Sequence, residues 1–355
     1  MNERDERIDF LRGLALIVIC LDHIHGNIVA SFTPLALGYS DMAEVFVFLS
    51  GIVSVWSFER RAVRYGVFRA IGTFWVRAVV LYAAYVAGGT LLILWMRLTG
   101  TTAFISFHQY GAAMYPAGRL FTEIASCKQH VPHLTILPVY VLGLAILPIL
   151  LMLGRRLPQV GRQALLLSVA AALYAAVQLD AVTLSAEMLA ALYFHPASWL
   201  ALFLAGAWLG LFPQAAGAAS WPAKLWLAAF VFSGAGLILL MLLAHSQLVA
   251  PHLNKPELGP LRLIHFGLVS LLVLCLLPAR HERYWKSVQF CGRQSLWVYL
   301  VGAFVSVELT AILQALGRVW WAQSLVNLAA ICICLAVGFV AEWKRGSRPP
   351  SGENL

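Results

Sequence analysis

The chain is built mostly from apolar runs of about 20 residues, separated by short polar segments. In helical conformation, a run of this length crosses the hydrocarbon layer of a bilayer. About ten runs fit this description, and we expect each of them to form one transmembrane helix. They cover residues 9–28, 41–58, 78–98, 134–153, 163–180, 197–213, 224–244, 262–278, 294–314 and 320–342. The pattern therefore predicts an all-α, polytopic transmembrane helix bundle.

Composition supports this prediction. Of the 355 residues, 61% are hydrophobic and only 12% are charged, and the mean hydropathy is +0.80. A soluble domain carries about twice that charged fraction, so no large soluble domain fits in the chain. Residues 1–345 are expected to form a single integral membrane domain, followed by a short cytoplasmic tail at 346–355. Asp9 and Arg12 interrupt the first apolar run, and no clean cleavage site follows, so we interpret it as an uncleaved span.

The distribution of Lys and Arg predicts the orientation of the chain. If the N-terminus is cytoplasmic, 19 of the 25 basic residues fall on the cytoplasmic side. Such an excess marks the cytoplasmic loops of membrane proteins, so both termini are expected inside. The net charge of +9 follows from this distribution of loop residues. It therefore indicates contact with membrane lipid and not with nucleic acid. The basic residues left outside are Arg97, Arg119, Lys128, Lys255, Arg262 and Arg318.

Two long outer loops, 99–133 and 245–261, interrupt the series of spans. Long ordered loops in compact domains are usually functional, and aromatic residues in the first loop suggest that it covers a site or dips into the membrane. The sequence contains no internal repeat, so an inverted-repeat transporter gains no support. A transporter or flippase of a glycan or small anionic solute nevertheless stays open as an alternative function.

The first span carries three ionisable residues, Asp9, Arg12 and His23. Arg12 and His23 are eleven residues apart, which puts them within ~20° of the same helix face and ~16 Å apart along the axis. Ionisable groups inside a membrane are costly and normally mark a pathway or an active site. Arg12 can bind an anionic ligand from the cytosol, and His23 can act as a general base in the outer half. Alternatively, Arg12 extends to the interface and His23 bonds to a neighbouring helix.

A second candidate group opens the second span. Asp41 and Glu44 lie one turn apart at its outer end, at the expected depth of His23. Glu44 is expected to orient and stabilise the imidazole, as a carboxylate does beside a catalytic base. Acidic residues are also favoured at a helix N-terminus for purely structural reasons. Gly51 lies on the same face as Glu44 and is expected to permit a close helix approach.

The remaining polar groups allow several interpretations. The basic segment that contains Arg69 and Arg77 can bind a phosphate-rich cytosolic donor, or it can simply face anionic lipid. His130 and His133 have the spacing of metal ligands, but no matching acid or thiol completes a site beyond Cys127, so no metal is expected. His195 and His265 lie at outer span ends, where they can line an acceptor cleft or sit at the membrane interface.

These residues resemble the integral membrane acyltransferases of the acyltransferase-3 superfamily, in which an Arg and a His are separated by ten residues in the first span. The resemblance is closer to the OpgC-type branch, which is similar to succinyl-transferring enzymes of osmoregulated periplasmic glucans. Thr135 and His195 depart from the residues expected in that branch. The similar segments are 7–15, 40–51, 136–140, 195–210, 258–265 and 292–299.

The resemblance implies an acyl-CoA-dependent O-acyltransferase of the bacterial inner membrane, with succinyl-CoA as co-substrate and no bound cofactor. The acceptor would be a hydroxyl of a periplasmic glucan or other glycan. Other glucan-synthesis proteins or a second copy of the chain would be further partners. The expected catalytic residues are His23, Glu44 and Asp41. The expected substrate-binding residues are Arg12, Asp9, Arg69, Arg77, Tyr140, His195, Trp199, His265 and Ser295.

Overall fold

The computed structural model describes residues 5–34, 38–101, 115–131, 133–212, 223–243, 250–276 and 286–347. Every regular element in these ranges is a helix, as the apolar pattern predicts. Parts of both predicted outer loops (102–114, 132 and 245–249) and most of the predicted tail (348–355) lie outside the described residues.

The helices follow one another along the chain with short connections. Two of them, η1 and η7, are short 3₁₀ helices. In order, the elements are α1 (Glu6–Asp22), η1 (Ile28–Phe32), α3 (Met42–Tyr65), α4 (Val67–Thr99), α5 (Ala117–Ala125), α6 (Leu137–Gly154), α7 (Gln159–Gln178), α8 (Ala186–Leu192), α9 (Pro196–Gly210), α10 (Ala223–Leu243), η7 (Ala250–Leu253), α11 (Pro260–Leu276), α12 (Lys286–Arg293), α13 (Ser295–Ala315) and α14 (Trp320–Gly346).

Each of the ten predicted spans coincides with one of these helices. Among the described residues, six helices are long and apolar enough to cross a membrane, and a seventh span results if the bent pair α8 and α9 counts as one. These six are α3, α4, α6, α7, α13 and α14. The helices α1 and α11 are shorter, with 17 residues each, and α10 is not among the six, so the exact number of crossings stays a prediction. The protein is therefore a multi-pass helical membrane protein.

The first predicted span ends earlier than its apolar run. Helix α1 stops at Asp22, and the predicted range 9–28 was wrong beyond that point. Gly26 turns the backbone with a φ of 83°, a conformation that glycine adopts without strain. Asn27 then caps the 3₁₀ helix by accepting a hydrogen bond from the Val29 amide. His23 consequently lies at the C-terminal end of α1, next to a connecting segment.

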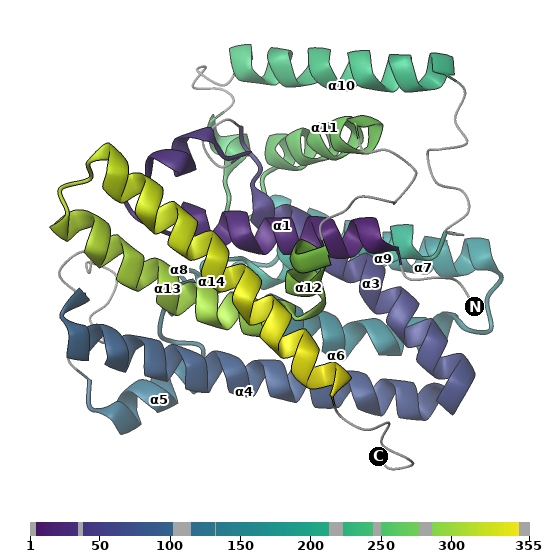
Figure 1. Ribbon diagram of the computed structural model, residues 1–355. Helices are drawn as coiled ribbons and strands as arrows, with labels where there is room; N and C mark the ends of the chain where they lie inside the picture. Colours follow the sequence, from purple (N-terminus) through teal and green to yellow (C-terminus); the bar gives the residue numbers. More distant parts are fainter. Residues whose placement is uncertain are drawn as a thin grey trace.

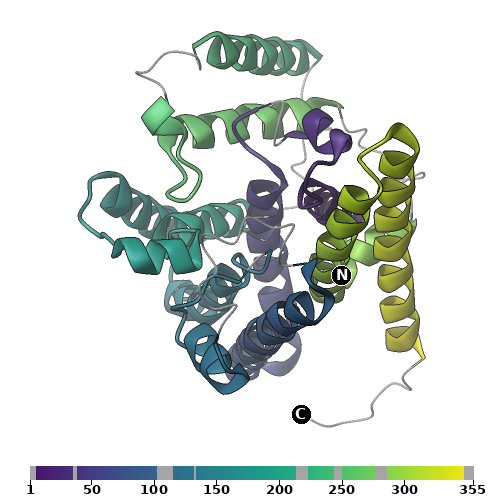
Figure 2. The same ribbon diagram turned by 90° about the vertical axis from the view of Figure 1, so that its left-hand side faces the viewer.

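Helix α1 occupies a central position in the bundle. It contacts α3, α12, α13 and α14, and Figures 1 and 2 show it surrounded by these elements, with α11 and then α10 stacked on one side. Its crossing with α12 is very close, since a side chain at Gly13 or Gly292 would overlap the backbone of the other helix. This contact fixes the Arg12 end of α1 against the segment that leads into α13.

A second close crossing joins α3 and α9. A Cβ atom at Gly51 would overlap the carbonyl oxygen of Phe203, and one at Gly206 would overlap that of Phe48. The close approach predicted for Gly51 is confirmed. This crossing holds the N-terminal part of α3, which begins beside Asp41 and Glu44, against α9.

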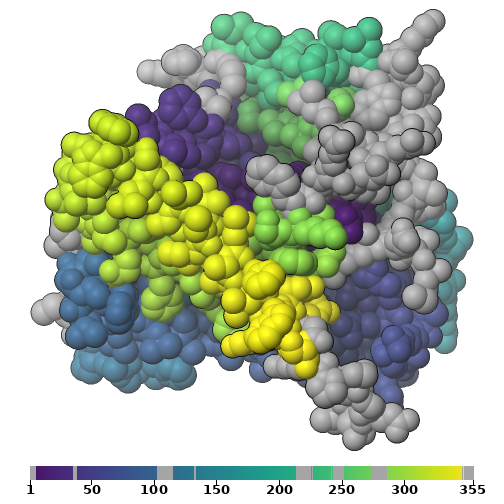
Figure 3. Space-filling model, viewed as in Figure 1, coloured from purple at the N-terminus to yellow at the C-terminus, as the bar shows by residue number. Residues whose placement is uncertain are grey.

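The outer surface of the bundle is strongly apolar. Helix α14 runs across the face shown in Figure 3, and α12 lies beside it. Large apolar side chains on this and other outer helices are exposed, including Leu328 and Phe339 on α14 and Val231 and Phe232 on α10. Exposed apolar surface of this extent suits contact with lipid rather than with water.

Candidate active site

Arg12 is held at one end of α1 by two contacts. Its guanidinium donates to the Ser295 hydroxyl at 3.1 Å and lies over the Phe46 ring, 5.4 Å from the centroid. Ser295 is the first residue of α13, and Phe46 belongs to α3. The structure thus brings together two predicted substrate-binding residues, Arg12 and Ser295, that are far apart in the sequence.

Two buried hydroxyl groups lie near this guanidinium. Tyr140 of α6 packs edge-on against Phe46, with ring centroids 5.4 Å apart, and its hydroxyl lies beside that of Ser50. Neither hydroxyl has a hydrogen-bond partner of normal geometry among the described residues. Buried polar groups normally have partners, so the two hydroxyls are available to a polar ligand. Ser50 adjoins Gly51 in the sequence, but nothing in its spacing assigned it a role.

The other residues predicted at this end have different environments. Arg77 is exposed on α4 and lies close enough to Arg12, Arg61 and Arg345 to interact with their charges. These four residues form a cationic region. Arg69 lies two turns earlier on the same helix and is also exposed, but it is not among the cations that act on Arg77. Asp9 is buried and accepts a hydrogen bond from Arg293 of α12 at 3.1 Å. Asp9 therefore ties α1 to α12.

A small cavity lies along α1 from Leu16 to His23, one turn beyond Arg12. It has room for about one water molecule. Tyr299, which contributes to its wall, also lies close to Tyr140 at the Arg12 end. Tyr299 thus lies between the wall of the cavity and the buried Tyr140 hydroxyl. The lining residues of the cavity are Leu16, Ile19, Cys20 and His23 of the α1 segment, with His133, Val298, Tyr299, Gly302, Ala303 and Ser306 opposite.

The hydrogen bonds of His23 define which nitrogen can act as a base. Its Nδ1 lies 2.6 Å from the Ile19 carbonyl oxygen. A carbonyl only accepts hydrogen bonds, so Nδ1 carries the proton and Nε2 of the neutral ring is left as the acceptor. The His23 ring also meets His133 edge-to-face, with centroids 4.4 Å apart. The imidazole is thus oriented by its own helix and faces the cavity.

Glu44 has other partners than the predicted one. Its carboxylate accepts hydrogen bonds from the Arg262 guanidinium and, at 2.9 Å, from the Asp41 amide. Glu44 is fully buried and forms a capping box with Asp41 at the start of α3. The expectation that Glu44 orients His23 is therefore corrected, because Arg262 of α11 occupies the carboxylate and the Ile19 carbonyl orients the ring.

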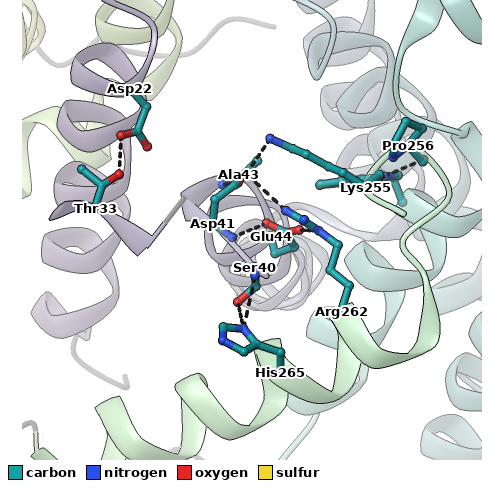
Figure 4. A network of polar contacts seen from close by, with 11 residues as sticks. Asp22, Thr33, Ser40, Asp41, Ala43, Glu44, Lys255, Pro256, Arg262 and His265 are labelled. Carbon is teal, nitrogen blue, oxygen red and sulfur yellow. Dashed lines mark hydrogen bonds and ion pairs between the residues drawn. The ribbon is translucent and has the colours of Figure 1, made fainter. Parts of the chain in front are cut away.

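Asp41 completes a network of four charges (Figure 4). Its carboxylate lies 2.5 Å from the Lys255 ammonium and 3.2 Å from the Arg262 guanidinium. Burial alone would raise the pKa of Asp41, but Lys255 and Arg262 hold it below its ordinary range. Burial likewise opposes the charge on Lys255, whereas Asp41 and Glu44 raise its pKa above the ordinary value. Both groups are therefore charged, and the network clamps the 250–262 segment to α3.

The remaining predicted residues surround this network. His265 is buried and lies 2.7 Å from the Ser40 hydroxyl through Nδ1 (Figure 4). Trp199 donates to the carbonyl of Pro256 at 3.0 Å, which holds the same segment. His195 is 2% exposed, and neither of its ring nitrogens has a partner within the described ranges. His195 is thus the residue of this group whose side chain is left available to a ligand.

Sequence reasoning missed the role of His133. It considered this residue only as a metal ligand, whereas the structure places its ring against His23 and its Nδ1 2.8 Å from the Ser306 hydroxyl. Both contacts depend on packing between distant segments, so no local spacing could have revealed them. Within the ranges that the structure covers, no three His, Cys, Asp or Glu side chains are arranged to hold a metal ion.

The fold and this site define a class of protein: a multi-pass helical membrane protein with a cation and an imidazole at opposite ends of its first helix and a cavity beside the imidazole. The chain belongs to the OpgC family, because the family model described as "OpgC protein" matches residues 4–346, nearly the whole chain. The resemblance drawn from the six sequence segments is confirmed. Neither the curated proteins nor the solved structures that were searched contain a match.

Proposed function

We propose that this OpgC-family protein is an O-acyltransferase of the bacterial inner membrane. It transfers an acyl group from cytosolic acyl-CoA to hydroxyls of a periplasmic glucan or other glycan. The observation that carries the proposal is the polar face of α1, where the Arg12 guanidinium lies near one end and an oriented imidazole, His23, lies at the other end and lines a cavity. Succinyl is the acyl group that we expect from the family resemblance.

The Arg12 end has the chemistry of a donor site. A guanidinium binds phosphate and carboxylate groups well, and Arg77 adds positive charge nearby. The hydroxyls of Ser50 and Tyr140 can bind polar groups of the acyl-pantetheine arm, which would then extend along the cavity. The cavity must widen to admit this arm, since it has room for about one water molecule in the present structure.

The His23 end has the chemistry of a general base. Nε2 takes the proton from the attacking sugar hydroxyl, whose oxygen adds to the thioester carbonyl, and the thiolate of CoA leaves. General-base assistance of this kind contributes ~10²–10⁴ in rate. A transient acyl-imidazole on the same nitrogen is an alternative route to the same product. His195 and Trp199, near the charged network, are proposed to contribute to acceptor binding.

The experiment that tests this proposal compares the periplasmic glycans of cells that produce the wild-type protein or the His23→Ala variant. The variant is expected to accumulate in the membrane at the wild-type level but to leave the glycans without the ester, because the base is removed. Mass spectrometry detects the ester and distinguishes succinyl from acetyl by the added mass. His252→Ala, an exposed position in η7, is the control and should keep the ester.

Full esterification by the His23→Ala variant would refute the assignment of His23. A transporter, the alternative function, would move an unmodified solute and leave glycan masses unchanged between wild-type and deletion strains. That result would contradict acyl transfer as a whole.

A further inference from the structure

Three histidines lie in a row from the cavity to the protein surface. The rings of His23 and His133 have centroids 4.4 Å apart, and those of His133 and His25 are 6.4 Å apart, both in edge-to-face geometry. His23 and His133 are partly buried, whereas His25 is exposed. The row therefore joins the proposed general base to the protein surface at its own end of the bundle.

The hydrogen bonds around His133 leave one basic nitrogen on its ring. The Ser306 hydroxyl lies 3.0 Å from the Ala303 carbonyl and 2.8 Å from His133 Nδ1. We assign its single proton to the carbonyl, and in that arrangement it accepts from His133 Nδ1–H. Nε2 of neutral His133 is then a proton acceptor, as it is in His23. Both rings line the same cavity, which has room for about one bridging water.

The acidic groups near this row are engaged elsewhere. Asp41 is paired with Lys255, and Glu44 with Arg262. Asp22 accepts a hydrogen bond from Thr33 at 2.6 Å, away from the imidazoles. The charged and titratable groups that act on His23 are Lys255, Asp41 and His25, and Arg318 acts on His25.

We propose that His133 and His25 form a relay that carries the proton from His23 to the aqueous phase during acyl transfer. This inference rests on the proposed function and adds the path of the proton. The ester C–O bond forms and the thioester C–S bond breaks, and its electron pair leaves with the CoA thiolate. The hydroxyl proton moves to His23 Nε2, then to His133, then to His25 and finally to water.

Two further properties of His133 suit a relay. Burial, together with the neighbouring imidazoles His23 and His25, lowers the pKa of His133 well below its ordinary value. The protonated ring is therefore disfavoured, so His133 does not retain a proton. His133 also has a φ of 62°, a left-handed conformation that is uncommon for residues other than glycine and is often found at functional sites.

Chemical rescue tests the relay in whole cells. In His133→Gly, glycine tolerates the backbone conformation and leaves space for free imidazole. We expect the initial rate of ester appearance on the periplasmic glycans to fall about tenfold or more, and external imidazole to restore most of it. His25→Gln should slow the reaction and make its rate depend on the external buffer concentration. His252→Gln is the matched control and should show neither effect.

The relay is overturned if His133→Gly keeps its rate within about twofold of wild type, or if it is slow and imidazole has no effect. If the glycine variant does not accumulate, His133→Ala replaces it. If neither accumulates, a buffer-independent rate in His25→Gln overturns the relay. Glycan masses that do not differ between wild-type and deletion strains would refute the proposed function instead, so the two failures are distinguishable.

Discussion

Arg12 keeps its position through two contacts that a lysine cannot reproduce together. The planar guanidinium lies over Phe46 and donates to Ser295 at the same time. An ammonium group is a point charge without a flat face, so it loses the stacking and the fixed direction of the hydrogen bond. At the scale of single residues, shape as well as charge therefore defines the proposed donor site.

We expect Arg12→Lys to lower kcat/KM for acyl-CoA by about tenfold or more, mainly through KM, because the positive charge is kept but misplaced. Initial rates of acyl transfer in membranes, measured over a range of acyl-CoA concentrations, check this expectation. Arg64→Lys is the control, since Arg64 is an exposed residue at the end of α3. An unchanged KM in Arg12→Lys would contradict a role in donor binding.

Local spacing predicted some residue contacts and not others. The apolar run and the i, i+11 spacing placed Arg12 and His23 on one helix face, and the cavity follows that face. Glu44 was assigned to the wrong partner, because its real partner Arg262 comes from a helix 218 residues further along the chain. The contacts of His133 with His23 and Ser306 were missed for the same reason. Contacts between distant segments depend on packing, which a single sequence does not display.

At the scale of elements, the crossing of α3 and α9 depends on two glycines. Gly51 and Gly206 allow the backbones to approach so closely that even one methyl group would overlap a carbonyl oxygen. Small residues at helix crossings are the usual means of close packing in membranes. The crossing also positions the start of α3, where the four-charge network clamps the loop before α11.

We expect Gly51→Ala to destabilise the protein by about 1–3 kcal/mol, because α3 and α9 must separate to accept the methyl group. Thermal unfolding of the purified protein in detergent should show a lower Tm. Gly72→Ala in α4 provides a matched control, since a Cβ atom there would meet nothing within 4 Å. Equal Tm values for the two variants would show that the α3–α9 approach is less tight than the structure indicates.

The helices themselves were largely predictable, whereas several of their ends were not. Apolar runs identify helices because unsatisfied backbone groups are too costly in lipid. Helix α4 nevertheless begins at Val67, well before the predicted range 78–98, because its first turns are amphipathic and carry Arg69 and Arg77. Hydropathy alone does not detect such an extension.

At the scale of the whole molecule, the orientation in the membrane decides which side each end of the cavity faces. The predicted excess of Lys and Arg on one side places the Arg12 end towards the cytosol and the His23 end towards the periplasm. Donor and acceptor would then approach from opposite aqueous phases, as the proposed reaction requires.

Reporter fusions test this orientation. Green fluorescent protein fused after residue 347 should fluoresce, and alkaline phosphatase fused at the same position should be inactive, because the C-terminus is expected in the cytosol. Alkaline phosphatase inserted after Lys128, in the predicted outer loop, should be active. Active phosphatase at the C-terminus would reverse the topology and place the proposed donor site on the wrong side.

The position of the cavity along α1 implies that the proposed reaction moves charge across the membrane. If the hydroxyl proton leaves past His25 while the CoA thiolate withdraws along α1 towards the cytosol, each turnover moves negative charge inward. A membrane voltage that is negative inside opposes this movement by about 2.3 kcal/mol per elementary charge and 100 mV. Acyl transfer through this bundle would then be electrogenic, and collapsing the voltage would accelerate it.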